Sequence, residues 1–188
     1  MSPEFLMGRR QALVAGGAAA LLGLSSAAAQ GTLNSVRTGG GIAGGGWLNF
    51  GPSEAQFSVF GSTFTVEGSD APVVFGAFNW FDAAGFTMNL SKLLTYGPDR
   101  DDEKARIMTG YLSRSDNDNI HAFRLRLTDA GGPGEELDTI ELLVGGPVEQ
   151  EAEFPDIDEM TAMINVSGPI EVGDLQLLTF DFGGEEEE

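Results

Sequence analysis

The segment that most constrains the fold of this chain is Ile120–Thr128, in which apolar and polar side chains alternate. Successive side chains of a β-strand point to opposite faces, so this period of two predicts a strand with one face in a core. The core-facing set is His121, Phe123, Leu125 and Leu127. The opposite set is Ala122, Arg124, Arg126 and Thr128.

Similar short segments, each bounded by Gly, Pro, Asp or Asn, run along the rest of the chain. They are 56–59, 63–66, 73–81, 86–90, 105–112, 137–144, 160–167 and 175–182. No long segment after residue 30 keeps a helical period. We therefore expect an all-β protein, an antiparallel β-sandwich or barrel of roughly 9–11 strands. The nearly continuous apolar run Val73–Phe81 predicts a strand that is buried on both faces.

The N-terminal 30 residues have the pattern of a secretory signal peptide. Arg9 and Arg10 precede the uncharged run Gln11–Leu24, and small residues follow it up to Gln30. This run is too short for a membrane span. The paired arginines resemble a twin-arginine signal, with an ordinary Sec signal as the alternative. Residues 1–6 precede a second Met and read as a start-site difference or an added extension.

Composition divides the remainder into three parts. Residues 31–46 contain two Gly-Gly-Gly runs and predict a flexible linker, with a segment that lies along a neighbouring sheet edge as the alternative. Residues 47–182 predict a single β domain, and residues 183–188 form an acidic tail. Signal cleavage would leave no membrane span and a secreted, periplasmic or cell-surface protein.

Charge and cysteine content exclude several classes of function. After Gln30 the chain carries 28 acidic and 8 basic residues, so its net charge is 8 − 28 = −20. Such a field repels nucleic acid and anionic membranes. It fits either solubility, including in a saline habitat, or attraction of divalent cations. With no cysteine, disulfides and Cys-ligated metals are excluded.

Two groups of carboxylates could bind Ca²⁺. Asp116 and Asp118 have the spacing that begins a calcium loop, but no glycine or closing glutamate follows, and the same residues build turns. Asp129 and Asp138 flank a Gly-rich bend and could converge on a cation or on an arginine. The structural alternative is that Asp129 and Asp138 accept hydrogen bonds from backbone amides in a long loop.

No catalytic constellation stands out. His121 is the only histidine and lies on the apolar side of its strand, which favours a buried, structural role. A second histidine and a Gly-x-Ser-x-Gly elbow are both missing, so hydrolytic zinc sites and Ser-His-Asp triads have no support. A pair of acids acting on a glycosidic bond remains open, although no spacing marks one. We expect a protein that is not an enzyme.

Aromatic and basic residues give candidates for contact with a ligand. Thirteen Phe against two Trp and two Tyr is the composition of a core. Trp80 is expected in that core. Trp47 is a candidate for an exposed contact or for an anchor at the start of a strand. Together with Arg124 and Arg126 it could line a concave sheet face that binds a glycan or small ligand.

Three segments resemble a widespread family of exported bacterial β-domains. They are WLNFGPSEAQFSVF (47–60), ARIMTGYL (105–112) and FRLRLTDAGGPGEELDTIEL (123–142). The last resembles the family's Asp-x-Gly-x-Pro-Gly-x-x-Asp strand end, with one residue more before Asp138. Where the family has Phe-Gly-Phe this chain has Phe-Ser-Val. The resemblance implies secreted or surface-exposed β-structure without catalysis, and it assigns no ligand.

These observations favour an exported, non-enzymatic β-domain of the cell surface or matrix that can assemble with itself and can respond to cations. The apolar segment Leu175–Phe182 could pair with an open sheet edge of another copy. The alternative function is an extracellular module that binds glycans or a small ligand, and a less favoured one is an acid-pair hydrolase.

Overall fold

The computed structural model describes residues 36–50, 53–66, 72–117, 119–131, 137–149, 154–156, 159 and 161–181. Within these ranges the chain forms nine β-strands and no helix. The strands are β1 (Val36–Phe50), β2 (Ser53–Val66), β3 (Val73–Asp82), β4 (Thr87–Pro98), β5 (Ala105–Arg114), β6 (Ile120–Thr128), β7 (Thr139–Val148), β8 (Ala162–Pro169) and β9 (Val172–Asp181). The expectation of an all-β fold is confirmed, with the strand number at the low end of the predicted range.

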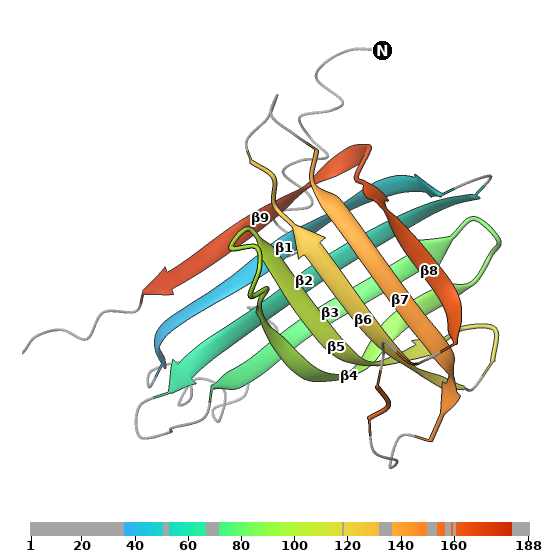
Figure 1. Ribbon diagram of the computed structural model, residues 1–188, viewed down its shortest axis with the longest axis horizontal. Helices are drawn as coiled ribbons and strands as arrows, with labels where there is room; N and C mark the ends of the chain where they lie inside the picture. The colour runs from blue at the N-terminus through green and yellow to red at the C-terminus, as the bar shows by residue number, and fades with distance from the viewer. Residues whose placement is uncertain are drawn as a thin grey trace, which may run out of the picture.

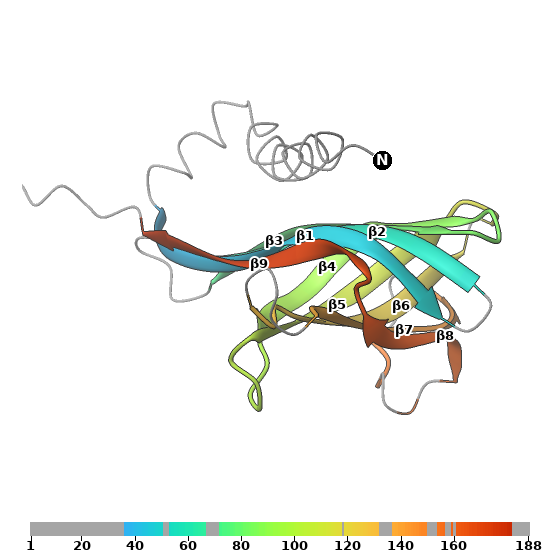
Figure 2. The same cartoon turned by 90° about the horizontal axis from the view of Figure 1, so that it is seen from above.

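All nine strands belong to one antiparallel sheet in the order β8-β7-β6-β5-β4-β3-β2-β1-β9 (Figure 1). From β1 to β8 each strand pairs with the next in the chain, and β9 returns to pair with the outer side of β1. The sheet is curled into a half-barrel. In Figure 2, β9, β1, β2 and β3 form one layer and β5 to β8 the other, and the concave interior lies between them.

A tight corner joins the two ends of the sheet. Only Ile170 and Glu171 separate β8 from β9. The Ile170 amide donates to the Asp138 carbonyl at 2.8 Å, and the Glu171 amide donates to the Trp47 carbonyl at 3.0 Å. These bonds bring the beginning of β7 and the end of β1 to the same turn. The half-barrel is therefore closed at one corner by the chain itself.

The core fills the concave side of the sheet. Its largest fully buried side chains come from both layers and include Trp80, Phe57, Phe78, Phe123, Met108 and Leu125. Gly61 and Gly76 pair across β2 and β3 and face this core. A Cβ at Gly61 would lie 2.6 Å from the ring of Tyr96. Glycine at this position thus makes room for an aromatic ring from the other side of the core.

The predicted linker is wrong for residues 36–46, which belong to β1. The glycines of this segment pair with β2 on one side and with β9 on the other. A Cβ at Gly41 would lie 2.6 Å from the Gly61 carbonyl oxygen, and one at Gly45 would lie 2.4 Å from the Phe57 carbonyl oxygen. The glycines allow this close approach of neighbouring backbone, and hydrogen bonds on both sides offset their entropy cost. Residues 31–35 lie outside the described part of the chain.

The prediction that Val73–Phe81 is buried on both faces is also wrong. Phe78 and Trp80 face the core, whereas Val73 and Phe81 on the other face are each 46% exposed. The expected signal peptide, residues 1–30, and the acidic tail, residues 183–188, are outside the described ranges. Within those ranges, no helix has the length and hydropathy needed to cross a bilayer.

Candidate functional site

The convex face of β9, β1, β2 and β3 is the most unusual surface of the molecule. Strand pairing without a shift across these rows places five outward positions on each of the four strands. On β9 and β1 these are Val172, Asp174, Gln176, Leu178, Phe180, Trp47, Gly45, Ala43, Gly41 and Gly39. On β2 and β3 they are Gln56, Ser58, Phe60, Ser62, Phe64, Phe81, Asn79, Ala77, Phe75 and Val73. We call these residues the uncharged face.

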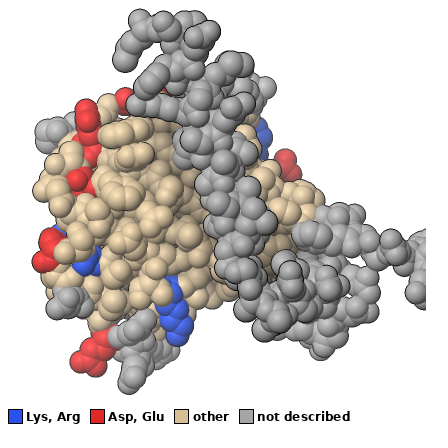
Figure 3. All heavy atoms as spheres, turned by 180° about the vertical axis from the view of Figure 1, so that it is seen from behind, with Lys and Arg blue, Asp and Glu red and all other residues tan. Residues whose placement is uncertain are grey.

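The uncharged face holds a single ionisable side chain, Asp174. Charged residues make up 21% of the chain, so twenty positions drawn at that frequency would carry about four. Figure 3 shows the molecule from this side: its visible described surface is largely free of charge at the centre, and acidic groups gather toward the edges. In a chain with a net charge of −19, a sheet face with one acid departs from the rest of the surface.

Large apolar side chains lie exposed on the uncharged face. Among described residues, six large hydrophobic side chains are exposed, and four of them, Trp47, Val73, Phe81 and Val172, belong to this face. Phe60 contacts Phe75 with ring centroids 5.9 Å apart, and Phe64 contacts Phe180 at 5.6 Å. Phe60 itself is 3% exposed, so the exposed apolar side chains lie at the two ends of the face and not across its centre. Exposed apolar side chains gathered on one sheet face mark an interaction surface. Trp47 is thus an exposed aromatic side chain, in agreement with one of its two sequence-based interpretations.

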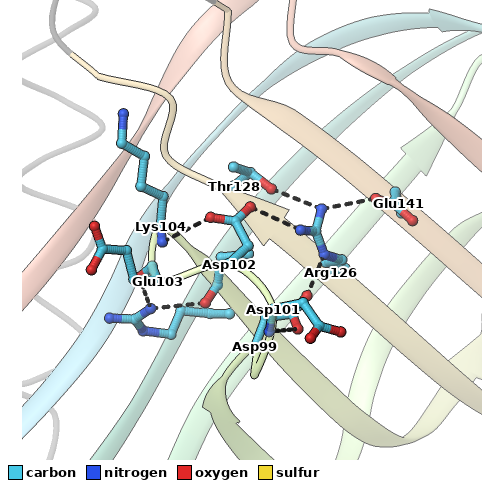
Figure 4. A network of polar contacts seen from close by, with 10 residues as sticks. Asp99, Asp101, Asp102, Glu103, Lys104, Arg126, Thr128 and Glu141 are labelled. Carbon is cyan, nitrogen blue, oxygen red and sulfur yellow. Dashed lines mark hydrogen bonds and ion pairs between the residues drawn. The ribbon is translucent and has the colours of Figure 1, made fainter.

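The convex face of the other layer carries charge, and Arg126 near the end of β6 is the hub of a network of polar contacts on it (Figure 4). The guanidinium donates to Asp99 at 2.7 Å, to Asp102 at 2.9 Å and to Glu141 at 2.9 Å. It also donates to the Thr128 hydroxyl at 3.1 Å. Hydrogen bonding to Arg126 holds the pKa of Asp99 below its usual value. Arg126 therefore ties the acidic β4–β5 loop to β6 and β7, which is a structural role.

Arg124 lies on the same strand as Arg126 and borders a shallow hollow. The side chains that line it with Arg124 come from β7 and β8 and include Glu141, Leu143, Asn165 and Ser167. Trp47 and Arg126 are not among the lining residues. Four strands separate β1 from β6 in the sheet order, and this face is convex. The prediction that Trp47, Arg124 and Arg126 line one concave site is therefore wrong.

Asp129 and Asp138 bind the outer edge of β9. The Asp138 carboxylate accepts from the amides of Leu175 at 2.6 Å and Ala130 at 2.9 Å. The Asp129 carboxylate accepts from the amide of Leu177 at 2.8 Å and from that of Gly131 at 3.2 Å. The two acids thus accept hydrogen bonds from backbone amides, as the structural interpretation predicted, but across the open side of the half-barrel. Burial raises the pKa of Asp138, although its two amide donors act in the opposite direction.

Asp116, another predicted calcium ligand, lies between β5 and β6. Both oxygens of Asp116 bond to Arg114, at 2.9 Å and 2.5 Å, and hydrogen bonding to Arg114 lowers the pKa of Asp116. Asp118 lies outside the described residues. Within the described ranges, no group of three or more His, Asp or Glu side chains is arranged to hold a metal ion. Calcium binding stays a prediction.

His121 lies in the core, as predicted. It is 1% exposed, and its Nδ1 lies 3.0 Å from the Gly145 carbonyl oxygen, a hydrogen bond in the tautomer that carries a proton there. The ring helps to fix a bulge in β7, where Gly145 and Gly146 interrupt the pairing with β6. A buried imidazole bonded to backbone is a structural element.

Sequence reasoning missed both the partners of Arg126 and the uncharged face. Asp99 and Asp102 belong to a run of acids that reads as a solvated loop, and they meet Arg126 only because β5 and β6 are paired. A usable signal existed for the uncharged face. The apolar run 73–81 and the glycine-rich segment 39–45 lack charge at every outward position. Comparison with protein-family models, with curated proteins and with solved structures found no match.

Proposed function

We propose that this chain is an exported, non-enzymatic structural β-domain of the cell surface or extracellular matrix that works by association through the uncharged face. The observation that carries the proposal is this face itself, with one acid among twenty outward positions and four large apolar side chains exposed. Exposed apolar area costs free energy in water, and burial against a partner recovers it at about 25 cal/mol per Å².

The roles of the other candidate residues support the same proposal. Arg126, Asp129 and Asp138 are engaged in holding loops and strand edges, and His121 is buried. The polar groups that could have formed a reactive cluster are thus used by the fold. The resemblance to exported β-domains and the expected signal peptide agree with a location outside the cytosol.

Retention at the cell surface tests the proposal. The full chain is expressed with its N-terminal segment in the source organism, and its amounts in envelope, matrix and medium fractions are compared. Phe81→Glu and Val73→Glu place an acid on the uncharged face, at side chains that are each 46% exposed. Met163→Glu is the matched control, because Met163 is 40% exposed on β8, outside that face. We expect both face variants to shift to the medium and the control to stay.

Equal retention of all three variants would contradict the proposal. A protein that remains in the cytosol with its N-terminal segment intact would contradict the export part alone. Thermal unfolding of each variant shows whether a shift to the medium reflects a lost surface or a lost fold.

A binding module for a glycan or small ligand is the second candidate, because the hollow beside Arg124 combines a guanidinium, a carboxylate, an amide and a hydroxyl. Such a mixture of donors and acceptors suits hydroxyl-rich ligands. A glycan array compares the wild-type chain with Arg124→Ala and Asn165→Ala, which both border the hollow. Binding that both variants lose would support this candidate, and the absence of any bound glycan would remove it.

A further inference from the structure

We infer that the uncharged face binds the same face of a second copy of this chain, and that salt promotes this pairing. The inference rests on the proposed function and names its partner. Three features of the described residues carry it: the extent of the face, the distribution of apolar groups on it, and the placement of charge around it.

The extent of the face is sufficient for a specific dimer. Four strands spaced about 4.8 Å apart and five rows spaced about 6.8 Å apart cover about 650 Å² on each copy. Phe60 and Ser62 within this area are only 3% and 0% exposed, so about 1,300 Å² in total is the upper bound for two copies, against the roughly 1,000 Å² expected of a specific interface. Two sheet faces pack at a distance of about 10 Å, a geometry that small outward residues on β1 permit.

The distribution of side chains is suited to self-pairing. One end of the face carries a row with Trp47, Val172 and Phe81, and the other end carries Phe64, Phe180 and Val73 in a second row. The middle rows hold mostly small or neutral polar residues, together with Phe60, Phe75, Leu178 and the single acid Asp174. A two-fold axis therefore brings apolar ends onto apolar ends and places the middle rows, with one acid per copy, against each other. Such self-complementarity is what an interface between identical subunits requires.

The placement of charge favours another copy over a basic partner. A basic protein would be drawn to the acidic edges of the molecule and would gain nothing from the neutral face. A second copy is repelled at long range by a net charge of −19, but meets almost no charge at the face itself. Glu54 and Glu171 lie just beyond the row of Trp47, so two copies bring these carboxylates near one another. Screening by salt removes most of that repulsion.

The hydrogen bonds of β9 direct the pairing to the face and away from the edge. On the edge of β9 that does not pair with β1, the backbone amides of Leu175 and Leu177 already donate to the carboxylates of Asp138 and Asp129. Addition of a strand along this part of β9 would have to displace both carboxylates. The predicted edge pairing through 175–182 is therefore less favourable than contact between faces.

Sedimentation velocity of the exported chain, released from the envelope fraction, tests the inference. The weight-average mass is measured over a range of protein concentrations at about 0.01 M and about 1 M NaCl, where the screening length is about 30 Å and about 3 Å. We expect a monomer–dimer equilibrium whose dissociation constant is at least about tenfold lower at the higher salt concentration. A monomer at every concentration and both salt levels would overturn the inference.

Substitutions locate the interface. Phe81→Glu and Val73→Glu should each raise the dimer dissociation constant at least about tenfold, and Met163→Glu should leave it unchanged. Val172→Glu, on the edge strand and 60% exposed, provides a further face variant should one of the first two fail to fold. Dimers that persist in all face variants would place the contact elsewhere and overturn the inference.

The outcome separates this inference from the proposed function. If the exported chain is monomeric at every salt level while face variants still leave the cell surface, the partner is another molecule and only the inference fails. If the chain dimerises through the face but surface retention is unaffected, the proposed function fails. If only the uncleaved precursor forms dimers, the dimer depends on the N-terminal segment that cleavage removes. That result would also overturn the inference.

Discussion

Arg126 holds three carboxylates from two other parts of the chain, so its replacement tests how much the β4–β5 loop depends on a single side chain. We expect Arg126→Met to lower the free energy of unfolding in urea by about 1–3 kcal/mol, because Asp99, Asp102 and Glu141 would lose their common donor. The free energy of unfolding of Arg126→Lys should lie between those of the wild type and Arg126→Met, since one ammonium cannot reproduce the guanidinium geometry. Equal stability of all three proteins would contradict this role.

Three aspartates should titrate on opposite sides of the ordinary Asp pKa of 3.8. Asp99 and Asp116 have lowered pKa values, so their stabilising contribution is present above pH 3.8 and is lost as the pH falls through their folded pKa. Asp138 has a raised pKa, so its contribution is complete below pH 3.8 and is lost as the pH rises through its folded pKa. Carboxyl resonances followed by NMR should show this order, and a lower midpoint for Asp138 than for Asp99 would contradict it.

Residue roles were predictable where local pattern decided them. Trp80 and His121 were expected in the core because each belongs to an apolar strand face, and both are buried. Hydrogen bonding of Asp129 and Asp138 to backbone amides was one of two interpretations. Their partners Leu177 and Leu175 lie 48 and 37 residues further along the chain. No local pattern carries such a pairing, which depends on how the sheet closes.

At the level of strands, the hydrogen bonds from Asp129 and Asp138 to β9 can be tested separately. Asp138→Asn replaces one acceptor oxygen by a donor, so either Leu175 or Ala130 loses its partner. We expect exchange of the Leu175 amide to accelerate at least about tenfold, which corresponds to about 1.4 kcal/mol. Asp129→Asn should act in the same way on the Leu177 amide.

Asp174→Asn is the matched control for these variants, because this carboxylate accepts from the side chain of Gln176 and not from the Leu175 or Leu177 amide. Acceleration of both amides by the control, to the same degree, would mean that β9 is held by its pairing with β1 alone.

Strand boundaries followed the sequence where side chains alternate and failed where glycine dominates. The segment 120–128 was predicted as a strand with the observed bounds. Residues 39–46 were predicted as a linker because glycine loses much entropy on ordering. The sequence does not show that two strands lie close against this segment. They approach so closely that the Cβ of a larger residue would clash with their backbone. That constraint comes from neighbours that are distant in the chain.

For the molecule as a whole, net charge makes stability depend on salt. The thermal midpoint of the Phe81→Glu variant should rise between about 0.01 M and about 1 M NaCl, because screening reduces repulsion among the wild-type excess of 19 negative charges and the one that the variant adds. A gain of 1 kcal/mol corresponds to about 2–4 °C for a domain of this size. A midpoint that falls or stays constant would contradict the prediction. Using a variant expected to be monomeric separates this effect from dimerisation.

The fold class was predictable and the closure of the sheet was not. Alternating segments separated by turn residues required an all-β fold, but a sandwich and a barrel share that pattern. The difference lies in the two residues Ile170 and Glu171, which connect β8 to β9 and donate hydrogen bonds to the carbonyls of Asp138, beside β7, and Trp47, in β1. The exposure of one face of Val73–Phe81 was not predicted for a related reason. An apolar run shows that both faces of a strand are apolar, but not whether the second face is covered by the same chain.

The position of β1 between β2 and β9 also bears on the order in which the protein can mature. Its glycine-rich backbone gains its second set of hydrogen bonds from β9, which is synthesised after the other eight described strands. Until then β1 offers an open, pliable edge to any extended peptide nearby. Polypeptides that end before Val172 should therefore be the species most prone to aggregate, because they lack β9, the strand that covers this edge of β1.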